Sequence, residues 1–194
     1  MIKNAANWLN YLPLSIVVIS AILFSNSLFA QDRKVQSKAY NAMLKTLLSH
    51  SVSEISVQQL SGQVNDVLLV DAREQKEYAV SHLNHSVWVG YDNLDLTPLS
   101  NVPKNKPIVV YCSVGYRSEK VAEKLIKQGF TNVKNLYGGI FEWKNQDKTI
   151  MNEKGETDQV HAFSKTWGVW LKKGRKSIID SNSYLKTKRL MAKT

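Results

Sequence analysis

The fold of this chain is decided by the stretch Pro107-Ile108-Val109-Val110-Tyr111-Cys112-Ser113-Val114-Gly115-Tyr116-Arg117-Ser118. Residues 107–111 form an apolar run, which is the pattern of a strand buried on both faces of a parallel sheet. Residues 118–128 place apolar side chains on one face of a predicted helix. Cys112 therefore follows the carboxyl end of a buried strand and precedes a helix, which is where open α/β sheets bind ligands.

Strand and helix patterns alternate on both sides of this stretch. Further strands are predicted at residues 67–70, 86–89 and 132–136, with a short extended piece around Ile55. Further helices are predicted at residues 74–80 and 140–143, and Ser56 can cap a helical turn that ends at Leu60. The alternation predicts an α/β fold of three layers, with a mostly parallel central sheet flanked by helices.

The loop after residue 111 is predicted to favour the thiolate of Cys112. Successive backbone N–H groups that point inward form an anion nest, and the positive end of the following helix adds to this field. The thiolate is the nucleophilic form of a cysteine. Gly115 permits a turn that other residues resist, and Arg117 offers a planar fork of donors to an anionic substrate. The alternatives are a buried inert thiol at Cys112 and an arginine paired with a carboxylate at Arg117.

Several motifs, in the expected order and spacing, resemble those of the rhodanese family. The loop from Cys112 to Ser118 resembles the family's active-site loop. Residues 70–74 with Glu77-Tyr78 resemble its early Asp-Val-Arg motif, His82-Leu83 resembles its Gly-His-Ile, and residues 136–140 with Trp143 resemble its closing motif. The resemblance covers about residues 53–148. It departs at Ser81, which replaces a glycine, and at residues 84–86, which replace a Pro-Gly-Ala turn.

The resemblance implies a single-domain rhodanese-like fold and a two-step sulfur transfer. The Cys112 thiolate takes the outer sulfur of a small donor such as thiosulfate, becomes a persulfide, and passes that sulfur to cyanide or a thiol. Substrate contacts are then expected from the loop residues Ser113, Val114, Gly115, Tyr116, Arg117 and Ser118. No metal or organic cofactor is implied.

The flanking motifs are predicted to maintain the fold rather than to react. Asp71, at a strand end, can accept backbone hydrogen bonds, and Arg73 and Glu77 have the i, i+4 spacing of helical partners. We expect His82 to be a scaffold histidine and Gly138-Gly139 to form a turn.

Two other functions remain open for such a domain. Cysteine-dependent phosphatases share the fold, but their loop places five residues between cysteine and arginine, whereas four lie between Cys112 and Arg117. The shorter loop should suit sulfur better than phosphate. A non-catalytic binding module is the other alternative, and the retained cysteine argues against it.

Charge and cysteine content exclude several classes of site. The net charge is +10, yet residues 53–150 carry 11 Lys and Arg against 11 Asp and Glu, while residues 151–194 carry 10 against 4, or +6. The basic tail can contact anionic surfaces or simply be solvated, and no interleaved basic and aromatic platform for nucleic acid is present. One cysteine and four scattered histidines give no intramolecular disulfide and little support for a metal site. The oligomeric state is left open.

The chain is predicted to have four parts. Residues 1–30 resemble an export signal, because a sparse positive start precedes the apolar run 16–24 and small residues up to Ala30; an uncleaved membrane anchor is the alternative. Residues 31–52 predict an amphipathic helix, residues 53–148 the rhodanese-like domain, and residues 149–194 a basic extension. Within the extension, residues 163–171 can fold back as a short helix, and the chain from Gly174 onward is expected to be loosely ordered. The protein is therefore expected outside the cytoplasm.

Overall fold

The computed structural model describes residues 35–178, and the predicted export signal or anchor lies outside them. In chain order the elements are α2 (Lys38–Leu47), β1 (Glu54–Ile55), α3 (Val57–Ser61), β2 (Leu68–Asp71), α4 (Gln75–Val80), β3 (Val87–Trp88), η2 (Thr97–Leu99), β4 (Ile108–Tyr111), α5 (Tyr116–Lys127), β5 (Val133–Leu136), α6 (Gly139–Asn145), β6 (Ile150–Asn152), β7 (Gly155–Thr157), β8 (Gln159–His161), η3 (Trp167–Trp170) and β9 (Arg175–Ser177). Within residues 35–178, no helix combines the length and apolar character that crossing a bilayer requires.

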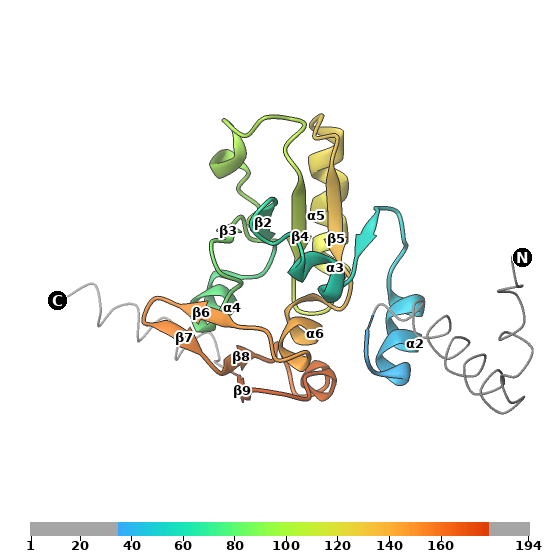
Figure 1. Cartoon of the computed structure of the whole chain (residues 1–194), viewed down its shortest axis with the longest axis vertical. Helices are drawn as coiled ribbons and strands as arrows, with labels where there is room; N and C mark the ends of the chain where they lie inside the picture. Colours follow the sequence, from blue (N-terminus) through green and yellow to red (C-terminus); the bar gives the residue numbers. More distant parts are fainter. Residues whose placement is uncertain (1–34, 179–194) are drawn as a thin grey trace, which may run out of the picture. The chain divides into compact units, whose positions relative to one another are not determined.

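Five strands form one sheet in the order β1-β5-β4-β2-β3, and every neighbouring pair is parallel. The predicted parallel α/β fold is confirmed. Strand β4 lies in the middle of the sheet, so its carboxyl end delivers Cys112 to the centre of the sheet edge (Figure 1). That is the position at which this class of sheet binds ligands.

Alternation of side chains along β4 divides the core into two layers. Ile108 and Val110 pack in one apolar cluster with Val121 of α5, whereas Val109 and Tyr111 belong to a second cluster with residues of α3 and α6. Successive side chains of a strand point to opposite faces of the sheet, so the two clusters lie on opposite faces. The fold therefore has the three predicted layers, with α5 running alongside β4 and β5 (Figure 1).

Local sequence explains where the short elements begin. Ser56 caps α3 as predicted, because its hydroxyl accepts from the backbone N–H of Gln59. The side-chain oxygen of Gln59 in turn accepts from the backbone N–H of Ser56. Helix α5 begins at Tyr116, two residues earlier than predicted, because Gly115 adopts a φ of 122° and turns the chain directly into the helix.

The amphipathic helix predicted for residues 31–52 is shorter in the structure and spans Lys38–Leu47. Its buried side chains Tyr40 and Leu44 face the core. The Tyr40 hydroxyl donates to the carbonyl oxygen of Gly138 at 2.9 Å, which ties α2 to the start of α6. The segment before the predicted domain is therefore part of the packed unit.

The chain beyond residue 148 also contributes to the core. Ile150, Val160 and Leu171 are fully buried in the cluster that contains Tyr111. The hairpin β6–β7 and strand β8 pack near α4 (Figure 1). Strand β9 pairs in parallel with β8, so the expected loose order from Gly174 onward is wrong as far as residue 178. The residues of β9 are polar and exposed or half-buried, so their composition did not indicate a strand; the strand forms through its pairing with β8.

Candidate active site

Cys112 lies at the end of β4 in the wall of a cavity of about 290 Å³. The residue is 1% exposed, and the backbone N–H of Gly115 donates to its Sγ at 3.1 Å. A buried thiol with an amide donor aimed at the sulfur differs from an inert core cysteine, because the donor stabilises negative charge there. The side chain borders a cavity and is therefore within reach of a ligand.

The carbonyl groups of the loop point away from the sulfur, toward the scaffold. The carbonyl oxygen of Cys112 accepts from the N–H of Ile140 at 2.9 Å, and that of Ser113 accepts from the N–H of Phe141 at 3.1 Å. The described residues contain no cis peptide bond. In a trans peptide the C=O and the following N–H point in opposite directions, so these contacts turn the N–H groups of Ser113 and Val114 away from α6. This is the polarity that an anion nest needs.

A buried polar pair fixes the peptide between Gly115 and Tyr116 in the same way. The side-chain amide of Asn135 donates to the carbonyl oxygen of Gly115 at 3.0 Å, and Ser118 Oγ donates to Asn135 Oδ1 at 2.7 Å. Ser118 is fully buried, and neither it nor Gly115 lines the cavity. The expected substrate contact from the Ser118 side chain is therefore wrong: this hydroxyl supports the loop from behind.

Gly138 and Gly139 form the predicted turn and bring α6 against the loop. Their φ values are 84° and 56°, which non-glycine residues rarely adopt. A Cβ on Gly139 would lie 2.4 Å from the carbonyl oxygen of Cys112, and one on Gly138 would lie 2.8 Å from Val35. Gly139 is thus required for the close approach that allows α6 to donate to the loop, and Gly138 makes room for Val35 and for Glu142 of α6.

Arg117 faces the cavity, but its guanidinium is already paired. Its two terminal nitrogens donate to the carboxylate of Glu77 at 2.6 and 2.8 Å, and one of them also donates to Ser113 Oγ at 3.1 Å. Burial opposes the charge of Arg117, yet the hydrogen bond to Glu77, the nearby Cys112 sulfur and the charge of Glu77 raise its pKa. The alternative of an arginine paired with a carboxylate therefore describes Arg117, which braces the loop through Ser113.

Three cavity residues were not predicted from sequence. Leu47, from the end of α2, and Phe163 and Trp167, from the segment after β8, line the cavity together with Val114 and Tyr116. The Arg117 guanidinium lies over the Phe163 ring, 5.1 Å from its centre. The apolar pattern of residues 163–171 indicated that this segment packs on the domain, but no local signal indicated that it reaches the cysteine.

The flanking motif residues hold the sheet edge together. Arg73 forms a fully buried ion pair with Asp71 at 2.6 Å and donates to the carbonyl oxygen of Ser81 at 2.6 Å. The helical pairing of Arg73 with Glu77, expected from their spacing, is wrong: Arg73 precedes α4 and turns back to Asp71, which leaves Glu77 for Arg117.

Of the departures from the family pattern, Ser86 is accommodated by a side-chain hydrogen bond, whereas the buried hydroxyl of Ser81 has no partner among the described residues. His82 stacks on the Tyr78 ring at 4.0 Å between centres, and its Nδ1 lies 3.0 Å from the Tyr78 carbonyl oxygen, as expected of a scaffold histidine. Ser86 Oγ lies 2.9 Å from the Tyr111 hydroxyl, which also accepts from the N–H of Leu83 at 3.0 Å. Residues 81–86 are therefore anchored to the strand that carries the cysteine.

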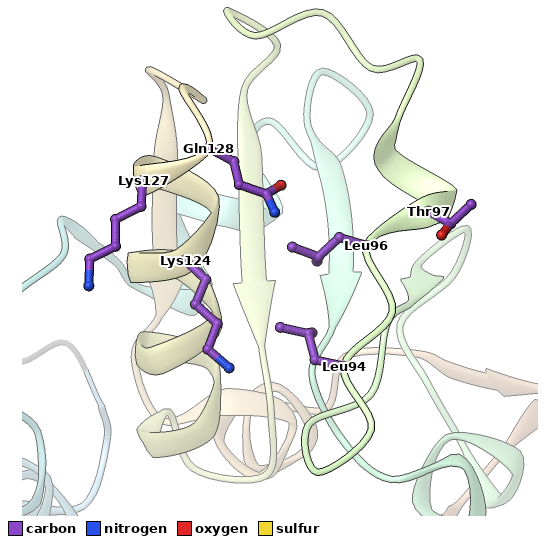
Figure 2. A pocket seen from close by; sticks show the side chains of 6 residues that line it. All are labelled: Leu94, Leu96, Thr97, Lys124, Lys127 and Gln128. Carbon is purple, nitrogen blue, oxygen red and sulfur yellow. The ribbon is translucent and has the colours of Figure 1, made fainter.

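A second hollow of about 530 Å³ lies at the carboxyl end of α5, the end farther from Cys112. Figure 2 shows Leu94 and Leu96 pointing toward α5, which contributes Lys124 and Lys127, and Gln128 follows the end of the helix. The lining of this hollow contains no cysteine, histidine or carboxylate. Among the described residues, the Cys112 cavity is therefore the stronger candidate for an active site.

The Glu77–Arg117 pair gives a test of the site's electrostatics. Burial opposes ionisation of Glu77, but the hydrogen bond and charge of Arg117, with a smaller effect of Arg73, lower its pKa to about 2. A carboxyl with a lowered folded-state pKa stabilises the protein above its unfolded pKa, near 4.5, and this stability is lost as the pH falls toward 2. We expect Glu77→Gln to cost about 2–4 kcal/mol at pH 7, because it leaves Arg117 unpaired.

Urea unfolding at several pH values measures this effect. The difference between wild type and Glu77→Gln should shrink as the pH falls from about 5 to about 2. Glu123→Gln is the matched control, since Glu123 pairs with Lys120 at the surface and such pairs contribute less than about 1 kcal/mol. Equal, pH-independent losses in both variants would contradict the buried pairing.

The region that contains Cys112 is similar in sequence to a known domain family and to known proteins. The model of the Rhodanese-like domain matches residues 56–146. A sulfurtransferase of Allochromatium vinosum is 33% identical over 107 residues, which cover 54% of this chain and 99% of that protein. The thiosulfate sulfurtransferase GlpE of Coxiella burnetii is 33% identical over 84 residues, covering 43% of this chain and 78% of that protein.

Proteins of other kinds share the same region. A tRNA uridine(34) hydroxylase of Aster yellows witches'-broom phytoplasma is 35% identical over 97 residues, 45% of this chain, but these cover only 30% of that protein. Among solved structures, protein BH2092 of Bacillus halodurans has a TM-score of 0.49 and 24% identity, covering 61% of this chain and 87% of that one. Because one relative is matched over almost its whole length at 33% identity, this chain belongs to the rhodanese family.

Proposed function

We propose that this protein is a sulfurtransferase that moves sulfane sulfur from a donor such as thiosulfate to a thiophilic acceptor through a persulfide on Cys112. The observation that carries the proposal is the amide of Gly115, which donates to Cys112 Sγ at 3.1 Å beside a cavity. The same donors can stabilise the terminal sulfur of a persulfide, which carries a negative charge. Membership of a family that includes sulfurtransferases supports it.

The proposed reaction has two displacement steps. The Cys112 thiolate attacks the outer sulfur of thiosulfate; a new S–S bond forms, the donor's S–S bond breaks, and sulfite leaves with the electron pair. The acceptor, for example cyanide, then attacks the outer sulfur of the persulfide; a C–S bond forms and the electron pair returns to Cys112 as a thiolate. Covalent catalysis of this kind divides one difficult transfer into two easier ones.

Arg117 has a positioning role in this mechanism. Its guanidinium holds Ser113 Oγ and the Glu77 carboxylate at the same time, so it fixes the first residue of the loop after the cysteine. The positive charge of Arg117 adds to the electrostatic field of the loop amides. However, both terminal nitrogens of its guanidinium already donate to Glu77. The loop amides therefore provide the main stabilisation of the bound sulfur.

Intact mass measurement tests the proposal. After incubation with thiosulfate, we expect the protein to gain about 32 Da, the mass of one transferred sulfur atom, and to lose it on addition of cyanide with release of thiocyanate. An aryl phosphate serves as the comparison substrate. Dephosphorylation without sulfur uptake would favour a cysteine phosphatase, and inertness toward both reagents would favour a binding module.

We also propose that the protein is exported and that its basic tail contacts anionic surfaces. The apolar run within residues 1–30 supports export from the cytoplasm, and the excess of Lys and Arg after residue 150 supports a weak contact of the tail with anionic surfaces.

A further inference from the structure

The cavity beside Cys112 is walled by segments that lie outside the residues matching the family model. That match ends at residue 146, yet Phe163 and Trp167 line the cavity, and Leu47 lines it from before the match begins. Side chains from two flanking segments therefore converge on one sulfur atom. This places an apolar surface where the non-sulfur part of a substrate must lie.

The charge of Arg117 is already balanced. Apart from the reactive Cys112, Arg117 is the one charged side chain among the described lining residues, and its guanidinium is held by Glu77 at 2.6 Å. The loop amides can serve an anionic group next to the sulfur, but an anionic body that lies against Leu47, Phe163 and Trp167 would have no partner there, which is costly. An uncharged apolar group would instead remove Leu47, Phe163 and Trp167 from water.

Phe163 is held at the cavity in an unfavourable backbone conformation. Its φ is 62°, in the left-handed region that a bulky residue rarely adopts. Its N–H donates to His161 Nδ1 at 3.1 Å, and its ring, 48% exposed, lies against Arg117. Strain of this kind persists only where the surroundings enforce it, and it concentrates at ligand sites. An exposed aromatic ring held beside the nucleophile has the properties of a binding surface.

We propose that the acceptor of the Cys112 sulfur is a small organic thiol with an uncharged, apolar body, such as an aryl-methyl or branched alkyl group. This inference rests on the proposed function and specifies its substrate class. The cavity volume of about 290 Å³ is near the lower end for small-molecule sites, so the body is the size of a single ring. The acceptor thiolate attacks the outer sulfur, forms the S–S bond of an organic persulfide, and returns the electron pair to Cys112.

Methanethiosulfonate reagents test the cavity without requiring sulfur transfer. The Cys112 thiolate attacks their sulfenyl sulfur, a mixed disulfide forms, and methanesulfinate leaves. Rates with the benzyl and the 2-sulfonatoethyl reagents are measured by intact mass, each divided by its rate with free cysteine. We expect the normalised rate of the benzyl reagent to exceed that of the anionic reagent by about 10-fold or more, the advantage of burying one ring.

Variants of the wall connect this preference to named residues. Phe163→Ala and Trp167→Ala should each lower the benzyl-to-sulfonatoethyl ratio by about 5-fold, and Phe163→Leu should retain most of the preference because it remains apolar. Val169→Ala is the matched control: Val169 is 49% exposed in the same turn as Trp167 but does not line the cavity. Its ratio should stay within about twofold of wild type. Equal normalised rates in wild type, or ratios unchanged by both wall variants, would overturn the inference.

The methanethiosulfonate rates are the first arm of the test, and the second arm uses protein loaded with sulfur from thiosulfate. Phenylmethanethiol should remove the sulfur faster than 2-mercaptoethanesulfonate, again by about 10-fold per thiolate. Failure of thiosulfate loading with the reagent preference intact would count against the proposed donor and leave the apolar cavity site supported. Successful loading with no preference in either arm would overturn the acceptor class alone.

Discussion

Cys112→Ser is expected to take up no sulfur from thiosulfate and to transfer none to cyanide above the uncatalysed rate. A hydroxyl at this position cannot form a persulfide, and removal of a catalytic nucleophile commonly lowers a rate by about 10⁴-fold or more. Stability should change by only about 1 kcal/mol, because serine is of similar size and its oxygen can still accept from the N–H of Gly115.

Three measurements separate loss of chemistry from loss of fold. Intact mass after thiosulfate reports the adduct, thiocyanate formation reports the complete cycle, and urea unfolding reports stability. Sulfur uptake by Cys112→Ser would show that the sulfur is carried elsewhere, and a loss of several kcal/mol in this variant would show that the thiol mainly supports packing.

Gly139→Ala is expected to lower sulfur uptake by about 100-fold or more and stability by about 2–4 kcal/mol. The added Cβ would lie 2.4 Å from the Cys112 carbonyl oxygen and 2.7 Å from the Ser113 carbonyl carbon. Both are backbone atoms that no rotamer change can move, so the loop or α6 must shift. A displacement of about 1 Å is enough to lower a rate 100-fold when a reacting group is misplaced.

Gly129→Ala is the control for backbone strain. Gly129 also has a positive φ, 92°, but a Cβ there would meet nothing within 4 Å. It should cost about 1 kcal/mol through its backbone conformation and leave sulfur uptake unchanged. If the two variants lowered uptake equally, the contact between α6 and the loop would not be what positions the amides.

The central sheet could be predicted from the sequence because its signals are local. The apolar run at residues 107–111 and the shorter run at 67–70 can be buried in few ways, and β4 and β2 occupy these positions. The turn at Ser56 was predictable for the same reason, since its capping partner Gln59 is three residues away. The family motifs then indicated which end of the sheet carries the chemistry.

The partners of the charged residues could not be predicted in the same way. Glu77 and Arg117 are 40 residues apart, and only the sheet order brings them together. Spacing alone favoured the pair Arg73 and Glu77, but Arg73 lies before the helix and bonds to Asp71 instead. Local spacing is informative only when both residues belong to one regular element.

The apolar residues of the cavity wall could not be predicted either, because they come from segments that are still farther apart in sequence. Leu47 and Phe163 are separated by most of the domain, yet both line the cavity of Cys112. The apolar positions of each segment predicted that it packs somewhere, and tertiary structure alone determines where. The same reason explains the error after Gly174, because β9 forms only by pairing with β8.

A crystal structure of the protein loaded with thiosulfate most directly tests whether loop amides hold the transferred sulfur of Cys112. We predict one additional sulfur bonded to Cys112 Sγ, within hydrogen-bonding distance of backbone N–H groups of residues 113–117. A sulfur that lies against the apolar wall without an amide donor, or a modified residue other than Cys112, would contradict this.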